Sequence, residues 1–368
     1  MANNHLATPD VELAPLLATI PPSAESTLPD INATRAWFDT NLIAGAHRAQ
    51  EPHLPPETAY VSKDHTLAVE GPGGEISVRS YVPVSSMGDA RFPMLFWTHG
   101  GGWVVGDLEW DDYYLKILCV DLQLVIVSPD YRVFRRRAPE CPFPTGINDA
   151  FAALKWAGLY RTAIRTPFLT SLQAKKNAGS FSADLSKGFL VGGPSAGGNF
   201  AAILAHRAKA DPEFSQHPLT GQILQYPVTV HPDVVPEEYK ENFTAYGQMT
   251  DVVILPTRFM HEFFQLLQAP PADPDVSPLL QRSFDGLPPA LVQVCGMDPL
   301  RDDGLLYAEK LTKAGVPTRL RVYPGAPHAF HICFPQTKIA QRFEAELKDA
   351  TRWMLAGAPS DEPQAAQT

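Results

Sequence analysis

Three residue types that can together activate a hydroxyl group occur at three separate places in this chain. Ser195 lies within Gly193-Pro-Ser-Ala-Gly197, and Asp298 and His328 follow much further along. A serine hydroxyl is a poor nucleophile until a base takes its proton, and that base needs a carboxylate to fix its tautomer and stabilise its charged form. The three residues in this order therefore predict a catalytic triad, provided that the fold brings them together.

The residues around Ser195 match the Gly-x-Ser-x-Gly pattern of a sharp turn between a strand and a helix. An apolar run from Lys187 leads into the pattern, and Ala201-Ala-Ile-Leu-Ala-His206 follows it. A Cβ at Gly193 or Gly197 would crowd a turn that holds the serine in a strained backbone conformation. Short patterns of this kind also occur in ordinary turns, and it is the strand before and the helix after that favour a nucleophile here.

Asp298 and His328 each follow an apolar run that predicts a buried strand. Asp298 comes after the run that ends at Cys295, and His328 lies in the loop after the next run. Two other acids, Asp302 and Asp303, fall where the following helix is expected to begin, and acidic residues are favourable at a helix start. We therefore assign the triad carboxylate to Asp298.

A second glycine-rich segment, His99-Gly-Gly-Gly-Trp103, follows the first buried strand. Adjacent glycines let backbone N–H groups converge without side chains in the way. We expect the N–H groups of Gly101, Gly102 and Ala196 to form an oxyanion hole, with His99 and Gly100 supporting the loop. A phosphate-binding loop is the alternative, but its lysine and serine and the dinucleotide-binding spacing are absent.

From Met94 onward, short continuous apolar runs alternate with helical stretches, which is typical of a mainly parallel sheet flanked by helices on both faces. Before them, two alternating segments around Gly71-Pro-Gly-Gly74 predict an antiparallel hairpin. The expected strands are Tyr60 to Leu67, Glu75 to Val84, Met94 to Thr98, Leu124 to Val127, Gly188 to Val191, Ile223 to Tyr226, Ala290 to Val294 and Leu320 to Tyr323. The fold class is therefore α/β.

Two segments outside this rhythm are expected to cover the sheet edge. Ile31 to His47 has apolar residues at helical spacing, and Thr229 to Leu280 carries an apolar helix face between two strands. We expect them to form a cap over the active site, with ordinary core packing as the alternative for the second. The predicted division is 1–55 for the N-terminal cap segment, 56–228 and 281–356 for the core, 229–280 for the cap insert and 357–368 for a disordered tail.

Aromatic residues in these regions are candidates to line a substrate pocket. They are Trp103 beside the glycine loop and, from the insert, Phe263 and Phe264, with Trp37 in the N-terminal segment. Spacing alone does not separate a pocket wall from core. Two further segments, Arg132 to Arg137 and Arg161 to Ser186, are expected to be solvated loops.

The composition excludes several classes of partner. The 368 residues are 45% hydrophobic, enough for a sizeable core, and carry a net charge of -10, so no basic field exists to attract nucleic acid or an anionic membrane. No run of about twenty apolar residues predicts membrane insertion. The four cysteines show no close-spaced metal pattern, so we expect reduced thiols and no metal. The start of the chain does not resemble a secretion signal, and we expect a cytoplasmic enzyme.

Several motifs in order resemble the hormone-sensitive-lipase-like branch of the α/β-hydrolases, over about Tyr81 to Leu355. This resemblance implies a carboxylesterase without a cofactor, an eight-stranded sheet and a helical cap. The matching segments are His99-Gly-Gly-Gly-Trp-Val-Val-Gly-Asp-Leu-Glu109, Asp130-Tyr-Arg132, Ala138-Pro-Glu140 with Pro142-Phe-Pro144, the turn at Ser195, Asp275-Val-Ser-Pro278, Asp298-Pro-Leu-Arg-Asp302 and His328-Ala-Phe330.

The chain departs from the family pattern at two places. Pro194 stands before the nucleophile where the family usually has an acid. A proline pushes Gly193 toward extended geometry, which the end of a strand tolerates, so we expect the turn to survive. The second departure is the insertion of Phe134 to Arg137 between two of the motifs, which we expect to reshape one rim of the pocket.

The leading hypothesis is a serine esterase that acts on small to medium acyl esters. The same chemistry could serve a lactone, a thioester, an acetylated natural product or transfer of the acyl group to an alcohol, and the sequence does not separate these. A small-molecule receptor on the same fold is the alternative from another class. Retention of His328 argues against it, because the family's receptors replace that histidine. The oligomeric state stays open, a homodimer included.

Overall fold

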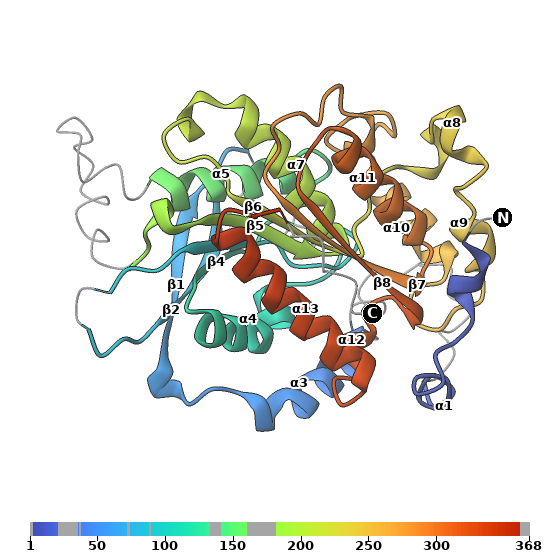
Figure 1. Cartoon of the computed structure of the whole chain (residues 1–368), viewed down its shortest axis with the longest axis horizontal. Coiled ribbons are helices and arrows are strands. Elements are labelled where there is room, and N and C mark those ends of the chain that lie inside the picture. The colour runs from blue at the N-terminus through green and yellow to red at the C-terminus, as the bar shows by residue number, and fades with distance from the viewer. Residues whose placement is uncertain are drawn as a thin grey trace, which may run out of the picture.

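An eight-stranded sheet lies at the centre of the molecule (Figure 1). The computed structural model describes residues 3–20, 36, 38–71, 74–87, 90–132, 141–159 and 182–360. The strand order is β1-β2-β4-β3-β5-β6-β7-β8. The strands are β1 (Tyr60–Ala68), β2 (Glu75–Pro83), β3 (Met94–Trp97), β4 (Val125–Pro129), β5 (Phe189–Pro194), β6 (Gly221–Gln225), β7 (Ala290–Met297) and β8 (Thr318–Pro327).

The pairing of these strands confirms the predicted fold class. β1 and β2 form an antiparallel hairpin, and β2 also pairs antiparallel with β4. Every other neighbouring pair, from β4 through to β8, is parallel. All eight predicted strands are present, because continuous apolar runs suit strands covered on both faces.

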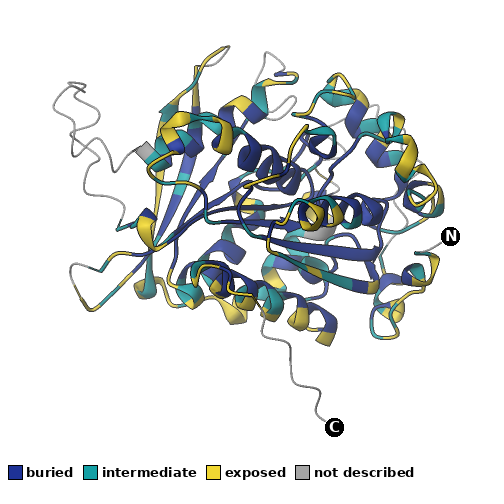
Figure 2. Cartoon of the chain, turned by 45° about the horizontal axis from the view of Figure 1, so that its top comes forward, coloured by how far each residue is buried: buried dark blue, intermediate teal, exposed yellow. Residues whose placement is uncertain are grey.

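The central strands are buried along their length (Figure 2), and their alternate residues belong to two different cores. In β3, for example, Met94 and Phe96 face one core, and Leu95 and Trp97 face the other. Helices α5, α7 and α11 cover the first face, and α4 and α13 cover the second (Figure 1). Since side chains alternate along a strand, a run that is apolar throughout builds both layers at once.

The covering helices begin with side-chain caps at several places. Asp107 accepts a hydrogen bond from the Glu109 N–H at the start of α4, and Thr337 accepts one from the Ala340 N–H at the start of α13. These helices are α4 (Leu108–Leu122), α5 (Thr145–Leu159), α7 (Ala196–Ala210), α11 (Arg301–Lys313), α12 (Phe330–Cys333) and α13 (Lys338–Leu355).

Shorter elements precede the sheet and fill the segment between β6 and β7. The first group is η1 (Asn4–Ala7), α1 (Ala14–Leu17), the π-helical turn η2 (Asp39–Ile43), α3 (Ala44–Gln50), η3 (Glu51–His53) and η4 (Glu57–Ala59). The second is η8 (Pro232–Val234), α8 (Glu237–Lys240), α9 (Ala245–Gln248), α10 (Thr257–Leu267) and η9 (Pro278–Leu280). Two single turns, η6 (Leu185–Lys187) and η7 (Pro212–Phe214), flank β5 and α7.

Some predictions fall outside the described residues. These are the first part of the Ile31 to His47 helix with Trp37, the inserted residues 134–137, most of the loop between 161 and 186, and residues 361–368 of the tail. The described end of the first segment is helical, as expected. Among the helices that the structure describes, none combines the length and the apolar character that crossing a membrane requires.

Candidate active site

Ser195 sits at the turn between β5 and α7. Its backbone has φ 56° and ψ −122°, a left-handed value that a serine adopts only when its surroundings impose it. Its N–H donates to the carbonyl oxygen of Gln225 (2.8 Å), which anchors the turn to β6. A Cβ on Gly193 or Gly197 would lie 2.3 or 2.0 Å from the carbonyl oxygen of Thr98, so side chains at these two places would push the turn away from β3.

Pro194 is accommodated at the end of β5 because its missing N–H is not needed there. Pro194 pairs in register with Gln225 of β6, and the next N–H, that of Ser195, makes the hydrogen bond. The sharp turn therefore forms despite the departure from the family pattern, as expected.

The structure brings Ser195, His328 and Asp298 together in one chain of hydrogen bonds. The Ser195 hydroxyl donates to Nε2 of His328 over 3.0 Å, and Nδ1–H of His328 donates to Oδ2 of Asp298 over 2.6 Å. Asp298 is fully buried, and its other oxygen accepts from the Leu300 N–H (2.8 Å). Because a carboxylate can only accept, Asp298 sets the tautomer that leaves Nε2 free to take the serine proton.

The order of the strands explains why these residues meet. Ser195 follows β5, Asp298 follows β7 and His328 follows β8, and these strands are parallel. Their carboxyl ends therefore lie along one edge of the sheet. An irregularity in the pairing of β7 with β8 between Cys295 and Met297 accompanies the two loops.

Tyr226, which the sequence analysis did not single out, packs edge-on against the His328 ring, with 4.6 Å between ring centroids. Its hydroxyl donates to Nε2 of His331 (3.0 Å), and Nδ1 of His331 donates to a Glu344 oxygen (2.9 Å). Burial raises the pKa of the Tyr226 hydroxyl well above its usual value, so it stays neutral beside the site. Its position directly after β6, at the same sheet edge, was the available signal.

The glycine loop after β3 faces the same turn. Among the described residues, no group accepts a hydrogen bond from the N–H of Gly101, Gly102 or Ala196. Gly101 and Gly102 have φ values of 115° and 58°, and a Cβ on Gly102 would lie 2.4 Å from Cδ2 of Phe263. Only glycine suits these two positions, because the backbone is left-handed at both and, at Gly102, helix α10 leaves no room for a Cβ.

His99 and its neighbours hold the loop in place. The His99 ring stacks on Tyr131 at 4.1 Å between centroids, and the Tyr131 hydroxyl donates to the His99 carbonyl oxygen (2.7 Å). Nδ1 of His99 also lies 2.8 Å from the carbonyl oxygen of Gly100. The fold therefore gives His99 a supporting position in the wall behind the loop rather than one facing the serine.

A cavity lies above Ser195, with about 670 Å³ of empty space that includes solvent at its open mouth. Its walls come from the core, from the N-terminal segment, through Phe38 and Ile43, and from the insert before β7, through Ile254, Leu255 and Phe263. Most of the lining is apolar, which suits the hydrocarbon part of a small molecule. The other lining residues include Gly100, Gly101, Gly102, Val105, Trp110, Asp111, Pro194, Tyr226, His328, Ala329, Ile332 and Cys333.

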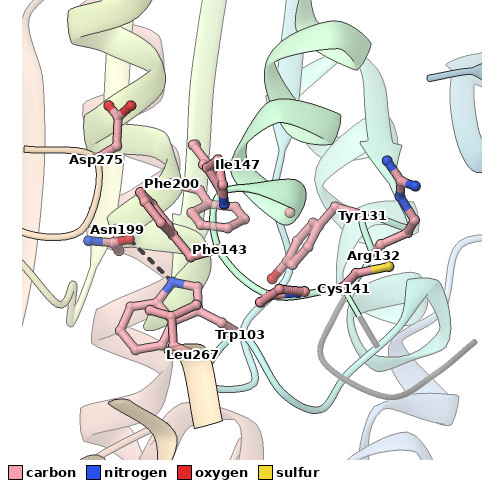
Figure 3. A pocket seen from close by; sticks show the side chains of 13 residues that line it. Trp103, Tyr131, Arg132, Cys141, Phe143, Ile147, Asn199, Phe200, Leu267 and Asp275 are labelled. Carbon is pink, nitrogen blue, oxygen red and sulfur yellow. Dashed lines mark hydrogen bonds between the residues drawn. The ribbon is translucent and has the colours of Figure 1, made fainter. Parts of the chain in front are cut away.

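Of the four aromatic residues expected at the pocket, Trp37 lies outside the described residues, Phe263 lines this cavity, and Trp103 and Phe264 do not. Trp103 lines a separate cavity beside Tyr131 and Phe200, where its indole N–H donates to Asn199 over 3.2 Å (Figure 3). Phe264 packs on Trp103, with 5.3 Å between ring centroids. Adjacent residues of a helix point in different directions, so Phe263 and Phe264 cannot share one wall.

The two acids near Asp298 tie α11 to the insert. Oδ1 of Asp303 accepts from the N–H groups of Thr229 and Val230, at 2.8 and 3.1 Å, and Asp302 accepts from the N–H of Thr244 at 2.7 Å. Both lie in the first turn of α11, as expected. Burial raises the pKa of the Asp303 carboxyl well above its usual value. Neither acid contacts His328, in keeping with structural roles.

Comparisons with known proteins agree with the fold. A family model described as an alpha/beta hydrolase fold matches residues 95–332. A versiconal hemiacetal acetate esterase from Dothistroma septosporum is 33% identical over 319 residues, covering 86% of this chain and 87% of that protein.

Solved structures extend the likeness to nearly the whole chain. The structure of a vibralactone cyclase is 41% identical with a TM-score of 0.86 and covers 97% of both chains. The thermostable carboxylesterase EstE1, cloned from a metagenomic library, is 28% identical with a TM-score of 0.71 and covers 91% of this chain and 99% of its own.

Proposed function

Because the chain belongs to the hormone-sensitive-lipase-like branch of the α/β-hydrolase family and is an esterase-type enzyme, we propose that Ser195, His328 and Asp298 hydrolyse a small to medium carboxylic ester. The hydrogen-bond chain from Ser195 through His328 to Asp298 is the observation that carries this proposal. It supplies a nucleophile, a base and an orienting carboxylate in contact with one another.

The acylation step uses each of these groups once. Oγ of Ser195 attacks the ester carbonyl carbon while Nε2 of His328 takes the serine proton. The bond to the alcohol oxygen then breaks, and His328 returns the proton to that oxygen, so that the alcohol leaves neutral. Asp298 stabilises the charged ring between the two transfers.

The negative oxygen of the tetrahedral intermediate needs donors that are already in place. The N–H groups of Gly101, Gly102 and Ala196 have no hydrogen-bond acceptor among the described residues and belong to the two turns that meet at Ser195. Donors of this kind typically contribute about 3 kcal/mol each to transition-state stabilisation. Water then attacks the acyl carbon while Nε2 of His328 takes a water proton. The bond from that carbon to Oγ of Ser195 breaks, His328 returns the proton to Oγ, and the acid leaves.

The cavity supports a substrate of moderate size and apolar character. Its lining residues come from both predicted cap segments as well as from the core. We therefore keep 1–55 and 229–280 as a proposed cap over a core of 56–228 and 281–356. A cytoplasmic location is a prediction from the sequence, and the sequence leaves the oligomeric state open, a homodimer included.

A second candidate is transfer of the acyl group to a hydroxyl of the substrate itself. The similarity to the vibralactone cyclase, at 41% identity, exceeds that to EstE1, at 28%. In such a ring closure the hydroxyl oxygen takes the place of water, its proton passes through His328 to Ser195, and the bond from the acyl carbon to Ser195 breaks. A lactone leaves instead of an acid.

Hydrolysis of p-nitrophenyl esters from acetate to decanoate tests the proposal. We expect the wild type to turn over the shorter esters and Ser195→Ala and His328→Ala to lose roughly 10⁴-fold or more in kcat. Ser215→Ala, at an exposed serine, is the matched control and should behave as wild type.

The products and the reactive serine decide between the candidates. Mass spectrometry of products from ω-hydroxy esters separates hydroxy acid from lactone. Hydrolysis that survives in Ser195→Ala would overturn the assignment of the nucleophile. A wild type that neither turns over these esters nor reacts with a fluorophosphonate at Ser195 would favour the receptor alternative instead.

A further inference from the structure

One acidic side chain stands in the wall of the cavity above Ser195 without a part in the proposed mechanism. Asp111 lies in the first turn of α4, lines the cavity and is only 6% exposed. On α4 it takes a place at helical spacing with Leu108, Leu115 and Leu118, all buried. A carboxyl in an otherwise apolar helix stripe is unfavourable unless something compensates for it.

The hydrogen bonds of Asp111 are incomplete. Its Oδ2 accepts from the indole N–H of Trp97 (2.8 Å). Its Oδ1 accepts no hydrogen bond from the residues that the structure describes. Hydrogen bonds to a charged group are stronger than those between neutral groups, so a donor brought by a ligand would satisfy Oδ1 of Asp111.

Burial dominates the electrostatics of this carboxyl. Desolvation raises the pKa of Asp111 to about 6, the hydrogen bond from Trp97 opposes this, and the nearby charge of Asp107 adds to it. The position in the first turn of α4 favours the charged carboxylate, but this effect is smaller than that of burial. Near neutral pH, both protonation states are therefore accessible. A hydroxyl suits both, because it can donate to a carboxylate and accept from a carboxylic acid.

Other ligand groups suit the site less well. A carboxylate would meet a like charge in an apolar cavity, and an ammonium group would lose its hydration with a single partner to replace it. Apart from the charge of Asp107, three neighbouring groups are neutral tyrosine hydroxyls. Tyr113, Tyr131 and Tyr226 feel the charge of Asp111, and burial holds the pKa of each well above its usual value.

We propose that Asp111 is a specificity-determining residue, which hydrogen-bonds a hydroxyl group on the acyl or alcohol part of the ester and excludes anionic substrates. This inference rests on the proposed esterase function and deepens it. It assigns the substrate class as hydroxylated esters with an otherwise apolar body.

Two variants separate the two parts of this role. Asp111→Asn keeps an oxygen that can accept from Trp97 but removes the charge, so rejection of a carboxylate should relax while a hydroxyl is still bound. Asp111→Leu removes both, so the preference for a hydroxyl should disappear. Asp112→Asn is the matched control, since Asp112 is the next residue of α4 but pairs with Arg79 and Lys116 and does not line the cavity.

The test compares esters that differ in one group. For p-nitrophenyl esters of four to eight carbons we would measure kcat/KM with a terminal methyl, hydroxyl or carboxylate, together with hydroxyalkyl and alkyl hexanoates. The wild type should prefer the best hydroxylated ester over its plain partner by about ten- to a hundredfold. Asp111→Leu should bring that ratio close to one, and Asp111→Asn should raise relative turnover of the carboxylate at least tenfold.

Each ratio is taken within one variant, so a general loss of activity cancels. Ratios that are the same in the wild type, Asp111→Asn and Asp111→Leu would overturn the inference while plain-ester hydrolysis upholds the proposed function. If the wild type hydrolyses no ester, the proposed function fails separately. Calorimetric binding of 1,6-hexanediol, 1-hexanol and hexanoate then decides whether Asp111 selects the hydroxyl.

Discussion

Two buried carboxyls of one site differ in how they are satisfied. Asp298 accepts hydrogen bonds at both oxygens, from His328 and from the Leu300 N–H. Asp111 accepts only one among the described residues, from Trp97. An aspartate side chain can therefore serve two purposes. Its hydrogen-bond partners, more than its burial, determine whether it orients a base or keeps one oxygen available to a ligand.

The raised pKa of Asp111 leads to a stability prediction. A carboxyl whose pKa is 3.8 when unfolded and about 6 when folded keeps its proton better in the folded state. The folded protein therefore loses up to about 3 kcal/mol of unfolding free energy as the pH rises from 4 to 7. Asp111→Asn lacks this loss, so its advantage over the wild type should be small at pH 4 and about 3 kcal/mol at pH 7, measured by denaturant unfolding.

A matched change of charge serves as the control. Glu238→Gln alters an exposed carboxyl of α8, and its difference from the wild type should stay flat over the same pH range. An Asp111→Asn difference that is equally flat would mean that burial does not govern this carboxyl. If Asp111→Asn gains stability and also loses its discrimination against carboxylate substrates, Asp111 stabilises function at the expense of the fold.

At the scale of elements, the glycine loop and the helix α10 depend on each other. Gly102 approaches the ring of Phe263 so closely that a Cβ would lie 2.4 Å from Cδ2, and its φ of 58° disfavours other residues. The loop proposed to hold the oxyanion is therefore shaped partly by an insert far away in the sequence. Substitutions on α10 should therefore shift the N–H groups of Gly101 and Gly102.

Gly102→Ala should lower kcat/KM for a plain ester by roughly a hundredfold, because the loop must shift and displace a donor. Adding Phe263→Ala makes room for the new methyl group, so the double variant should recover part of that loss. Steady-state kinetics of the four proteins in this cycle measure the coupling. If the losses of the two single variants simply add in the double variant, the contact between Gly102 and Phe263 does not shape the loop. Gly247→Ala, where a Cβ meets nothing within 4 Å, is the control.

In the molecule as a whole, the beginning of the described chain packs against the loop that carries His328. The Asp10 N–H donates to the carbonyl oxygen of Gly325 (3.2 Å), three residues before His328. Leu13 is fully buried in a cluster with Tyr226, Cys295 and Tyr323, under the carboxyl ends of the last strands. The beginning of the described chain thus packs against the end of β8, close to the loop that carries His328.

Leu13→Ala should lower the free energy of unfolding by about 2–5 kcal/mol, because it leaves a cavity in this cluster. Denaturant unfolding measures the loss, and activity should also disappear at a lower temperature than in the wild type. Leu54→Ala, at a residue that is 38% exposed, should change stability by no more than about 0.5 kcal/mol. Equal effects of the two substitutions would show that the segment around Leu13 does not stabilise the fold.

The fold class and the three residues nominated for the triad could be predicted from the sequence alone. Apolar runs that bury both faces of a strand are visible without a structure, and so is a serine between glycines after such a run. The parallel order then implies that loops after β5, β7 and β8 share one edge. These features are local in the chain, which is why their pattern could be recognised.

The other side chains that surround Ser195 could be identified only from the tertiary structure. Phe263 reaches the cavity while Phe264 turns to Trp103 in a separate one, because the rotation of α10 depends on what it packs against. Asp111 and Tyr226 enter the site through contacts between segments far apart in sequence, with Trp97 and His328. Burial and hydrogen bonding arise from such contacts, and no spacing along the chain encodes them.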